Sequence, residues 1–256
     1  MSSEEFKRFA LELAAIARKT VLPYFATAEL KIEIKEDLSP VTIADRAAEE
    51  AMRSAINSRY REHGIVGEEF GSANEGAEYV WYLDPIDGTK SFVRGCPLFG
   101  SLIALCRNGE PIIGVIDHPA LDMCCIGDGA QTLVNGREVK VSDHSDLKDC
   151  LLLTSDLTMV SRYQDISNFM SLIEQVQLFR TWGDCYGYTL VASGFADIMA
   201  DPVMNPWDLL ALIPVIEGAG GKITSWDGTE AKTAASIVAA PAALHSKVID
   251  ILNSPK

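Results

Sequence analysis

The chain has 256 residues, of which 48% are apolar and 23% charged, and its formal net charge is −14. This composition is ordinary for a soluble globular protein that buries one large core or two moderate ones. The acidic balance repels nucleic acid and anionic membranes, and no stretch approaches the roughly 18 apolar residues of a membrane span. We therefore expect a small-molecule partner rather than nucleic acid or a membrane.

Cysteine usage and the first residues indicate a cytoplasmic protein. The chain begins without an apolar segment behind basic residues, so we expect no signal peptide. None of the six cysteines shows a Cys-x-x-Cys spacing, and the four histidines are scattered along the chain. We interpret the cysteines as reduced thiols, and we expect no zinc site.

Periodicity in the first half of the chain predicts two helices followed by an antiparallel sheet. Apolar residues at helical spacing predict helices at about 3–24 and 43–63, with Gly64 ending the second. The alternating residues 31–35 between them predict a short strand or an extended arm. The predicted strands of the sheet lie at 79–83, 98–105, 111–117, 123–127 and 131–134, with turns at 107–110 and 135–136.

After about residue 145 the pattern changes to alternating strands and helices. The predicted strands lie at 150–154, 176–180, 196–200 and 236–239. The predicted helices lie at 164–175, 184–193, 209–217 and 245–252. We therefore expect an antiparallel-rich α+β domain at 1–145 and an α/β domain at 146–256.

The strongest chemical signal is the segment 81–91, Trp-Tyr-Leu-Asp-Pro-Ile-Asp-Gly-Thr-Lys-Ser. An apolar run leads to Asp84 and Asp87, and Gly88 follows directly, which indicates a strand that runs into a turn. Hard oxygen ligands at a strand end, next to free backbone N–H groups, suit Mg²⁺ and a phosphate together. An ordinary surface turn is the alternative interpretation, because Asp, Pro and Gly are common turn residues.

Two further motifs flank this segment. Upstream, Gly-Glu-Glu at 67–69 follows an apolar pair, and downstream, Trp-Asp at 207–208 opens a helix that ends in Glu-Gly-Ala-Gly-Gly at 217–221. The three motifs in this order resemble the inositol monophosphatase superfamily of Mg²⁺-dependent phosphatases, over about residues 10–240. The resemblance implies a two-domain, layered αβαβα sugar-phosphatase fold and a phosphoric monoester hydrolase.

The resemblance also implies two or three Mg²⁺ ions in each site. The implied ligands are Glu68 and Asp84 with the Ile86 carbonyl for the first ion, and Asp84, Asp87 and Asp208 for the second. Glu69 is the nearer rival to Glu68, and a helix N-cap is the alternative role for Asp208. Because so many negative charges repel one another without metal, we expect divalent ions to stabilise the protein.

Catalytic and phosphate-binding roles follow from the same resemblance. A pair formed by Asp45 and Thr89, together with Glu68, would orient and deprotonate the attacking water. Gly88 lets the backbone approach a phosphate, and the N–H groups of Gly88 and Thr89 would hold ester oxygens. Taken alone, Asp45 would be a solvated helix residue.

The segment 180–188, Arg-Thr-Trp-Gly-Asp-Cys-Tyr-Gly-Tyr, resembles the histidinol-phosphate phosphatase branch, as does Asp-Pro-Val-Met-Asn-Pro-Trp-Asp at 201–208. Histidinol phosphate carries an ammonium and a titratable imidazole, so Asp184 or Asp201 could pair with a cation and Asn205 with the ring. Arg180 could bind substrate or form a salt bridge across the site or a dimer contact. Alternatives are core packing for Trp182 and a helix N-cap for Asp184.

We therefore expect an enzyme of histidine biosynthesis that hydrolyses L-histidinol phosphate. An inositol monophosphatase or a broad-specificity sugar or polyol phosphatase is the alternative within the same class. A partner-binding regulatory protein on this scaffold is the alternative from another class, although the acidic surface disfavours nucleic acid. Homodimers are common in the superfamily, so the resemblance also implies a homodimer.

Overall fold

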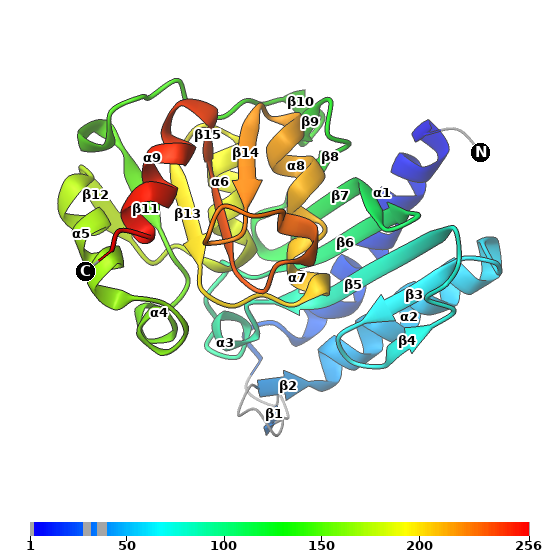
Figure 1. The fold of residues 1–256 in the computed structure, drawn as a ribbon. Coiled ribbons are helices and arrows are strands. Elements are labelled where there is room, and N and C mark those ends of the chain that lie inside the picture. Colours follow the sequence, from blue (N-terminus) through cyan, green and yellow to red (C-terminus); the bar gives the residue numbers. More distant parts are fainter. Residues whose placement is uncertain (1–2, 28–31, 35–39, 256) are drawn as a thin grey trace.

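Helices and β-sheets alternate in five layers through the molecule (Figure 1). The computed structural model describes residues 3–27, 32–34 and 40–255. The layers are a helix pair, an eight-stranded sheet, a middle group of helices, a five-stranded sheet and an outer group of helices. The expected layered αβαβα architecture is confirmed. Among the helices of the described ranges, none is long and apolar enough to cross a membrane.

Two helices, α1 and α2, form the first layer, and a 3-10 turn, η1, follows α1. Their bounds are Ser3–Val21 for α1, Leu22–Tyr24 for η1 and Ile43–Arg59 for α2. Buried residues recur three or four positions apart along both helices, which packs one face of each against the large sheet. The second helix ends at Arg59, before the predicted His63, because the backbone leaves the helical region at Tyr60 (φ −133°, ψ 68°) and Gly64 already begins a strand.

The eight-stranded sheet has the order β10-β9-β8-β7-β6-β5-β3-β4 and confirms the predicted strands of the first half. Its strands are β3 (Gly64–Gly67), β4 (Gly71–Ala73), β5 (Tyr79–Asp87), β6 (Gly100–Arg107), β7 (Glu110–His118), β8 (Met123–Gly127), β9 (Thr132–Val134) and β10 (Arg137–Glu138). Positive φ angles at Asn108-Gly109 and Asn135-Gly136 mark its two predicted turns. Side chains alternate between faces, so Trp81 contacts the first helix pair and Leu102 the middle helices.

The second half builds the remaining three layers. The five-stranded sheet has the order β12-β11-β13-β15-β14, with bounds Leu178–Arg180, Leu151–Leu153, Ile198–Asp201, Ile237–Pro241 and Gly221–Thr224. The middle helices are α6 (Asp184–Ala192), α7 (Pro206–Leu209) and α8 (Leu212–Gly218). The outer helices are α4 (Leu157–Tyr163), α5 (Ile166–Gln175) and α9 (Ala242–Leu252). Helix α4 and strand β14 were not predicted, and the helix predicted at 209–217 lies largely in α8, preceded by the separate short helix α7.

Short elements complete the chain. They are β1 (Ile32–Ile34), β2 (Pro40–Thr42), α3 (Thr89–Phe92), η2 (Pro119–Leu121), η3 (Leu147–Asp149) and η4 (Ala231–Thr233). Strands β1 and β2 pair antiparallel, which places a strand within the predicted 31–35 segment, whose two end residues lie outside the described ranges. Helix α3 follows the end of β5, where the motif of residues 84–91 lies.

Glycines allow helix α8 to lie directly on the large sheet. A Cβ atom at Gly114 of β7 would meet the Ala211 carbonyl oxygen at 1.9 Å. A Cβ atom at Gly127 of β8 would meet the Pro214 carbonyl oxygen at 2.4 Å. Both obstacles are backbone atoms, so the helix itself would have to move to make room for a side chain.

We predict that Gly114→Ala lowers the free energy of unfolding by about 2 kcal/mol, because one extra methyl group overpacks this contact. Urea unfolding of the purified protein measures the change. Gly76→Ala is the matched control, since a Cβ atom there meets nothing within 4 Å. Equal stability of the two variants would contradict this description of the packing.

Candidate active site

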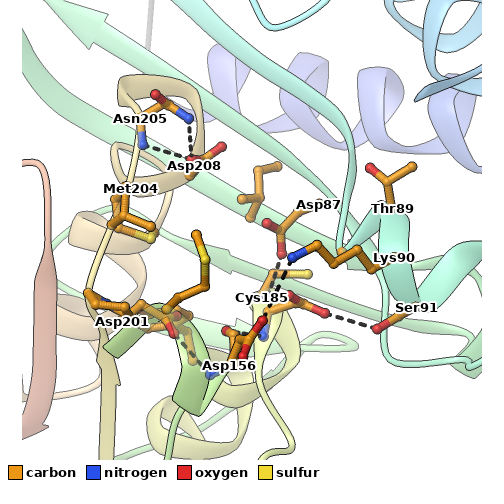
Figure 2. Close-up of a pocket in the computed structure, with 18 of the residues that line it drawn as sticks. Asp87, Thr89, Lys90, Ser91, Asp156, Cys185, Asp201, Met204, Asn205 and Asp208 are labelled. Atoms are coloured by element: carbon orange, nitrogen blue, oxygen red, sulfur yellow. Dashed lines mark hydrogen bonds and ion pairs between the residues drawn. The ribbon is translucent and has the colours of Figure 1, made fainter. Parts of the chain in front are cut away.

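Three carboxylates meet where β5 ends. The carboxylate oxygens of Asp84, Asp87 and Asp208 all lie within 4.8 Å of one another, close enough to hold a metal ion together. The first two belong to β5 and the third to α7. Figure 2 shows Asp87 and Asp208 on different walls of one pocket. Sequence reasoning had named all three as ligands, and the fold brings them together.

A bulge at the end of β5 gives the two aspartates their positions. The register of β5 against β6 shifts between Asp84 and Asp87. Inside the bulge the Ile86 N–H donates to Asp84 Oδ1 at 3.0 Å, and the Ser101 hydroxyl donates to the Pro85 carbonyl at 2.7 Å. Residues three positions apart face opposite sides of a regular strand, so the bulge is what lets both carboxylates join one cluster.

Burial and mutual repulsion raise the pKa values of these carboxyl groups. Burial is the largest cause for each of them, and the charge of Glu68 adds to it for Asp84 and Asp208. The pKa of Asp87 is also raised well above its usual value, by burial and then by the charge of Asp184. The pKa of Asp208 reaches about 7, although hydrogen bonds from Asn205 oppose the shift.

Glu68 joins the cluster from the loop between β3 and β4. It acts on Asp84 both through its charge and through a side-chain hydrogen bond. Its neighbour Glu69 instead acts on Asp45 through its charge. Of the two adjacent glutamates, Glu68 is therefore the one that belongs with the three aspartates.

A buried glutamate on α2, which sequence reasoning missed, holds this loop in place. Glu49 is fully buried and accepts hydrogen bonds from the Glu69 N–H at 2.7 Å and the Phe70 N–H at 3.1 Å. The Arg53 guanidinium donates to it at 2.7 Å. A Cβ atom at position 67 would meet Glu49 Oε1 at 2.1 Å, so only glycine permits this approach. The sequence signal that could have identified Glu49 is its position among the apolar residues on the buried face of α2.

The expected hydrogen bond between Asp45 and Thr89 is not formed in this structure. Asp45 Oδ2 accepts from the Thr42 N–H at 2.7 Å and from its hydroxyl at 2.6 Å, in a capping box at the start of α2. The Thr89 hydroxyl donates to the Ile86 carbonyl at 2.9 Å. The reason is local, since each side chain finds a partner three residues away on its own segment.

Helix α6 begins against the end of β5. Asp87 Oδ2 accepts a hydrogen bond from the Cys185 N–H at 2.5 Å, in the first turn of α6. Gly88 has a φ of 80°, and a Cβ atom there would meet Asp184 Oδ2 at 2.7 Å. The Ser91 hydroxyl donates to the same Asp184 oxygen at 3.0 Å. Gly183, rather than Asp184, is the N-cap of α6.

A cavity of about 680 Å³ opens beside the cluster, between the two sheets. Its walls come from the 87–91 segment, α4, the start of α6 and the 201–208 segment (Figure 2). Asp201 lies on its wall with both oxygens engaged, by the Ser155 N–H at 3.0 Å and the Tyr188 hydroxyl at 2.9 Å. Asn205 also lines it and is the N-cap of α7, where its N–H donates to Asp208 Oδ2 at 2.7 Å. Asp208 is thus the third residue of α7, not its N-cap.

Arg180 and Trp182, from the start of the 180–188 segment, do not line this cavity. Arg180 is exposed at the end of edge strand β12, where it donates to the Phe179 carbonyl at 2.7 Å, and it forms no salt bridge with any described residue. It is not among the residues that line the cavity. Trp182 is 42% exposed, so the alternative of core packing is wrong for this residue. The segment turns at the sheet edge, and only its later part enters α6.

Comparison with known proteins agrees with this geometry. The model of the inositol monophosphatase family matches residues 2–255. The chain belongs to the inositol monophosphatase family. It is a phosphoric monoester hydrolase.

The chain is similar in sequence or structure to three known members of the family. It is 43% identical to the bifunctional phosphatase IMPL2 of Arabidopsis thaliana, over 89% of this chain and 67% of that protein. It is 39% identical to the histidinol-phosphatase of Mycobacterium tuberculosis, over 96% of both chains. The solved structure of an inositol monophosphatase from Zymomonas mobilis superposes with a TM-score of 0.86 at 33% identity, over 98% of this chain and 99% of that one.

The raised pKa of Asp208 predicts how the metal-free protein responds to pH. Because this pKa is about 7 in the folded state and 3.8 ordinarily, the folded protein binds more protons than the unfolded chain between these values. The free energy of unfolding in EDTA should therefore fall as pH rises from about 4 through about 7. Urea unfolding at several pH values measures it, and Asp208→Asn should flatten the decline. Stability that is constant or rises over this interval would contradict the pKa shift.

Glu49 should control metal affinity through the loop that carries Glu68. We predict that Glu49→Gln raises the Mg²⁺ concentration for half-maximal activity about tenfold, as expected for a residue that orients a metal ligand. Exposed Glu50 on the same helix supplies the control variant, Glu50→Gln. A Mg²⁺ activation curve that is the same for both variants would show that Glu49 has no such role.

Proposed function

We propose that this enzyme hydrolyses L-histidinol phosphate to L-histidinol and phosphate with Mg²⁺ as its cofactor. One observation carries the proposal: the carboxylate cluster and a second group of acidic side chains share a single cavity. The second group consists of Asp156, Asp184 and Asp201. A substrate with a phosphate at one end and a cationic amine and imidazole at the other matches this distribution. The histidinol-phosphatase relatives support the same substrate, and with it a role in histidine biosynthesis.

The cluster suits magnesium by the chemistry of its donors. Asp84, Asp87 and Asp208 supply only hard carboxylate oxygens, and Glu68 adds a fourth carboxylate beside them. The Ile86 carbonyl can accept the Thr89 hydroxyl with one lone pair and retain the other for a metal. When bound, Mg²⁺ would neutralise the carboxylates and the phosphate and make an attacking water more acidic.

Thr89, Glu68 and Asp45 are the residues that we propose to act on this water. The Thr89 hydroxyl donates its hydrogen bond to the Ile86 carbonyl, so its oxygen can accept a hydrogen bond from water. Burial, against the hydrogen bonds from Thr42, raises the pKa of Asp45 to about 6, which suits a general base. Gly88 and Thr89 would present their N–H groups to the ester oxygens.

The cationic end of the substrate would lie toward α6 and the 201–208 segment. Asp184 is the favoured partner for the ammonium, because only one of its oxygens is engaged by a described donor, the Ser91 hydroxyl. Asp201 is only 4% exposed and each of its oxygens already accepts one hydrogen bond, so its main contribution would be its charge. The exposed Asn205 amide donates one N–H to Asp208 Oδ2, and its second N–H is available for an imidazole nitrogen.

Hydrolysis of inositol phosphates is the second candidate function. It is favoured by the full-length likeness to the Zymomonas mobilis inositol monophosphatase. An inositol phosphate has no cation, so it would leave the acidic half of the cavity without a partner. This difference in charge separates the two candidates in a direct comparison.

We predict that phosphate release from L-histidinol phosphate exceeds that from myo-inositol 1-phosphate by at least about tenfold in kcat/KM, one charge-assisted hydrogen bond being worth that much. Release should require Mg²⁺ and stop in EDTA. The Asp208→Asn variant should lose most activity towards both substrates, because the metal site serves either ester. A preference for inositol phosphate would replace the first candidate by the second and leave the metal site intact.

A further inference from the structure

Two cationic side chains line the cavity, and the metal cluster does not explain their role. Lys90 and Arg162 line it together with five aspartates. Such an acidic cavity repels a phosphate ester wherever metal does not offset the charge. Lys90 directly follows the Gly88-Thr89 pair proposed to hold the phosphate, so it is the cation nearest to that position along the chain.

Lys90 forms an ion pair across the cavity. Its Nζ lies 3.8 Å from Asp156 Oδ2, which joins the α3 wall to the start of α4 (Figure 2). Asp156 is held in place through its other oxygen, since Oδ1 accepts from the Thr158 N–H at 2.9 Å and from its hydroxyl at 2.7 Å. Lys90 is 68% exposed and has a long flexible stem, so it is the partner that can move.

We propose that the substrate replaces this ion pair, with its phosphate binding Lys90 and its imidazolium ring binding Asp156, while Asp184 keeps the ammonium. The proposal rests on the proposed function, because it requires a substrate that carries both charges. In the free enzyme the two side chains neutralise each other. In the complex each finds an opposite charge on the substrate, so neither is left unpaired.

The energetics of exposed ion pairs favour such an exchange. A pair with both partners in solvent contributes little to stability, so separating it costs little. The gain comes from two charge-assisted contacts between the substrate and these side chains. A phosphate ester without a cation would release Lys90 but leave Asp156 unpaired, which gives the pair a part in substrate selection.

Arg162 is the competing candidate for the phosphate. It lies in the last turn of α4, is exposed, and forms no salt bridge with a residue in the described ranges. Its place on α4 puts it on the Asp156 side of the ion pair rather than on the segment after Gly88. Its substitution therefore serves as a test between the two cations.

Separate probes for the two ends of the substrate test the exchange without turnover. Calorimetric titration of the Mg²⁺-loaded protein with inorganic phosphate, and separately with L-histidinol, gives a Kd for each end. Lys90→Gln should raise the Kd of phosphate about tenfold without weakening L-histidinol binding. Asp156→Asn should raise the Kd of L-histidinol about tenfold without weakening phosphate binding. Asparagine caps helices as well as aspartate does, so α4 should be retained.

Two further variants complete the experiment. Lys148→Gln removes a lysine that pairs with Asp146 at 3.0 Å outside the cavity, and it should change neither Kd. The proposal is overturned if Lys90→Gln and Asp156→Asn each affect both probes alike or affect neither. It is also overturned if Arg162→Gln weakens phosphate binding more than Lys90→Gln does. Failure of the wild-type protein to hydrolyse L-histidinol phosphate would instead refute the proposed function.

Discussion

Repulsion among buried carboxylates is the constraint on which the rest of this site depends. Glu68, Asp84, Asp87 and Asp208 come from three separate segments, and burial raises the pKa of each of the three aspartates. Such a group is unfavourable unless protons or a cation neutralise it. The fold therefore has to hold these side chains together against their mutual repulsion. A divalent cation that binds the folded state would remove this repulsion and raise the free energy of unfolding.

Backbone hydrogen-bond donors supply much of the restraint. Asp45 and Asp208 each occupy the third position of a helix, where one oxygen accepts the N–H of the residue that caps that helix. Asp87 accepts from the first turn of α6, and Glu49 fixes the loop beside Glu68. In the three aspartates these contacts engage one oxygen and leave the other for chemistry, whereas Glu49 uses both oxygens to hold the loop. The layered fold contributes by starting α6 and α7 at the end of β5.

Much of the site was predictable from sequence because it lies in contiguous motifs at element ends. The apolar run before Asp84 predicts its strand, and the Asn-Gly pairs predict the turns of the sheet. Helix α4 was not predictable, since its seven residues are too few to show a clear period. Glu49 and the Lys90–Asp156 pair depend on contacts between segments distant in sequence, which a single sequence does not encode locally. Arg180 sits in a recognisable motif, yet its strand ends at the sheet edge, away from the cavity.

Magnesium binding coupled to proton release tests the central claim most directly. Calorimetric titration of the metal-free protein with Mg²⁺ at pH 7, in two buffers of different ionisation enthalpy, gives the number of protons released. The account predicts binding with net proton release, because carboxyl groups protonated in the metal-free site must ionise to hold the cation. Binding without proton release, or no binding, would contradict it.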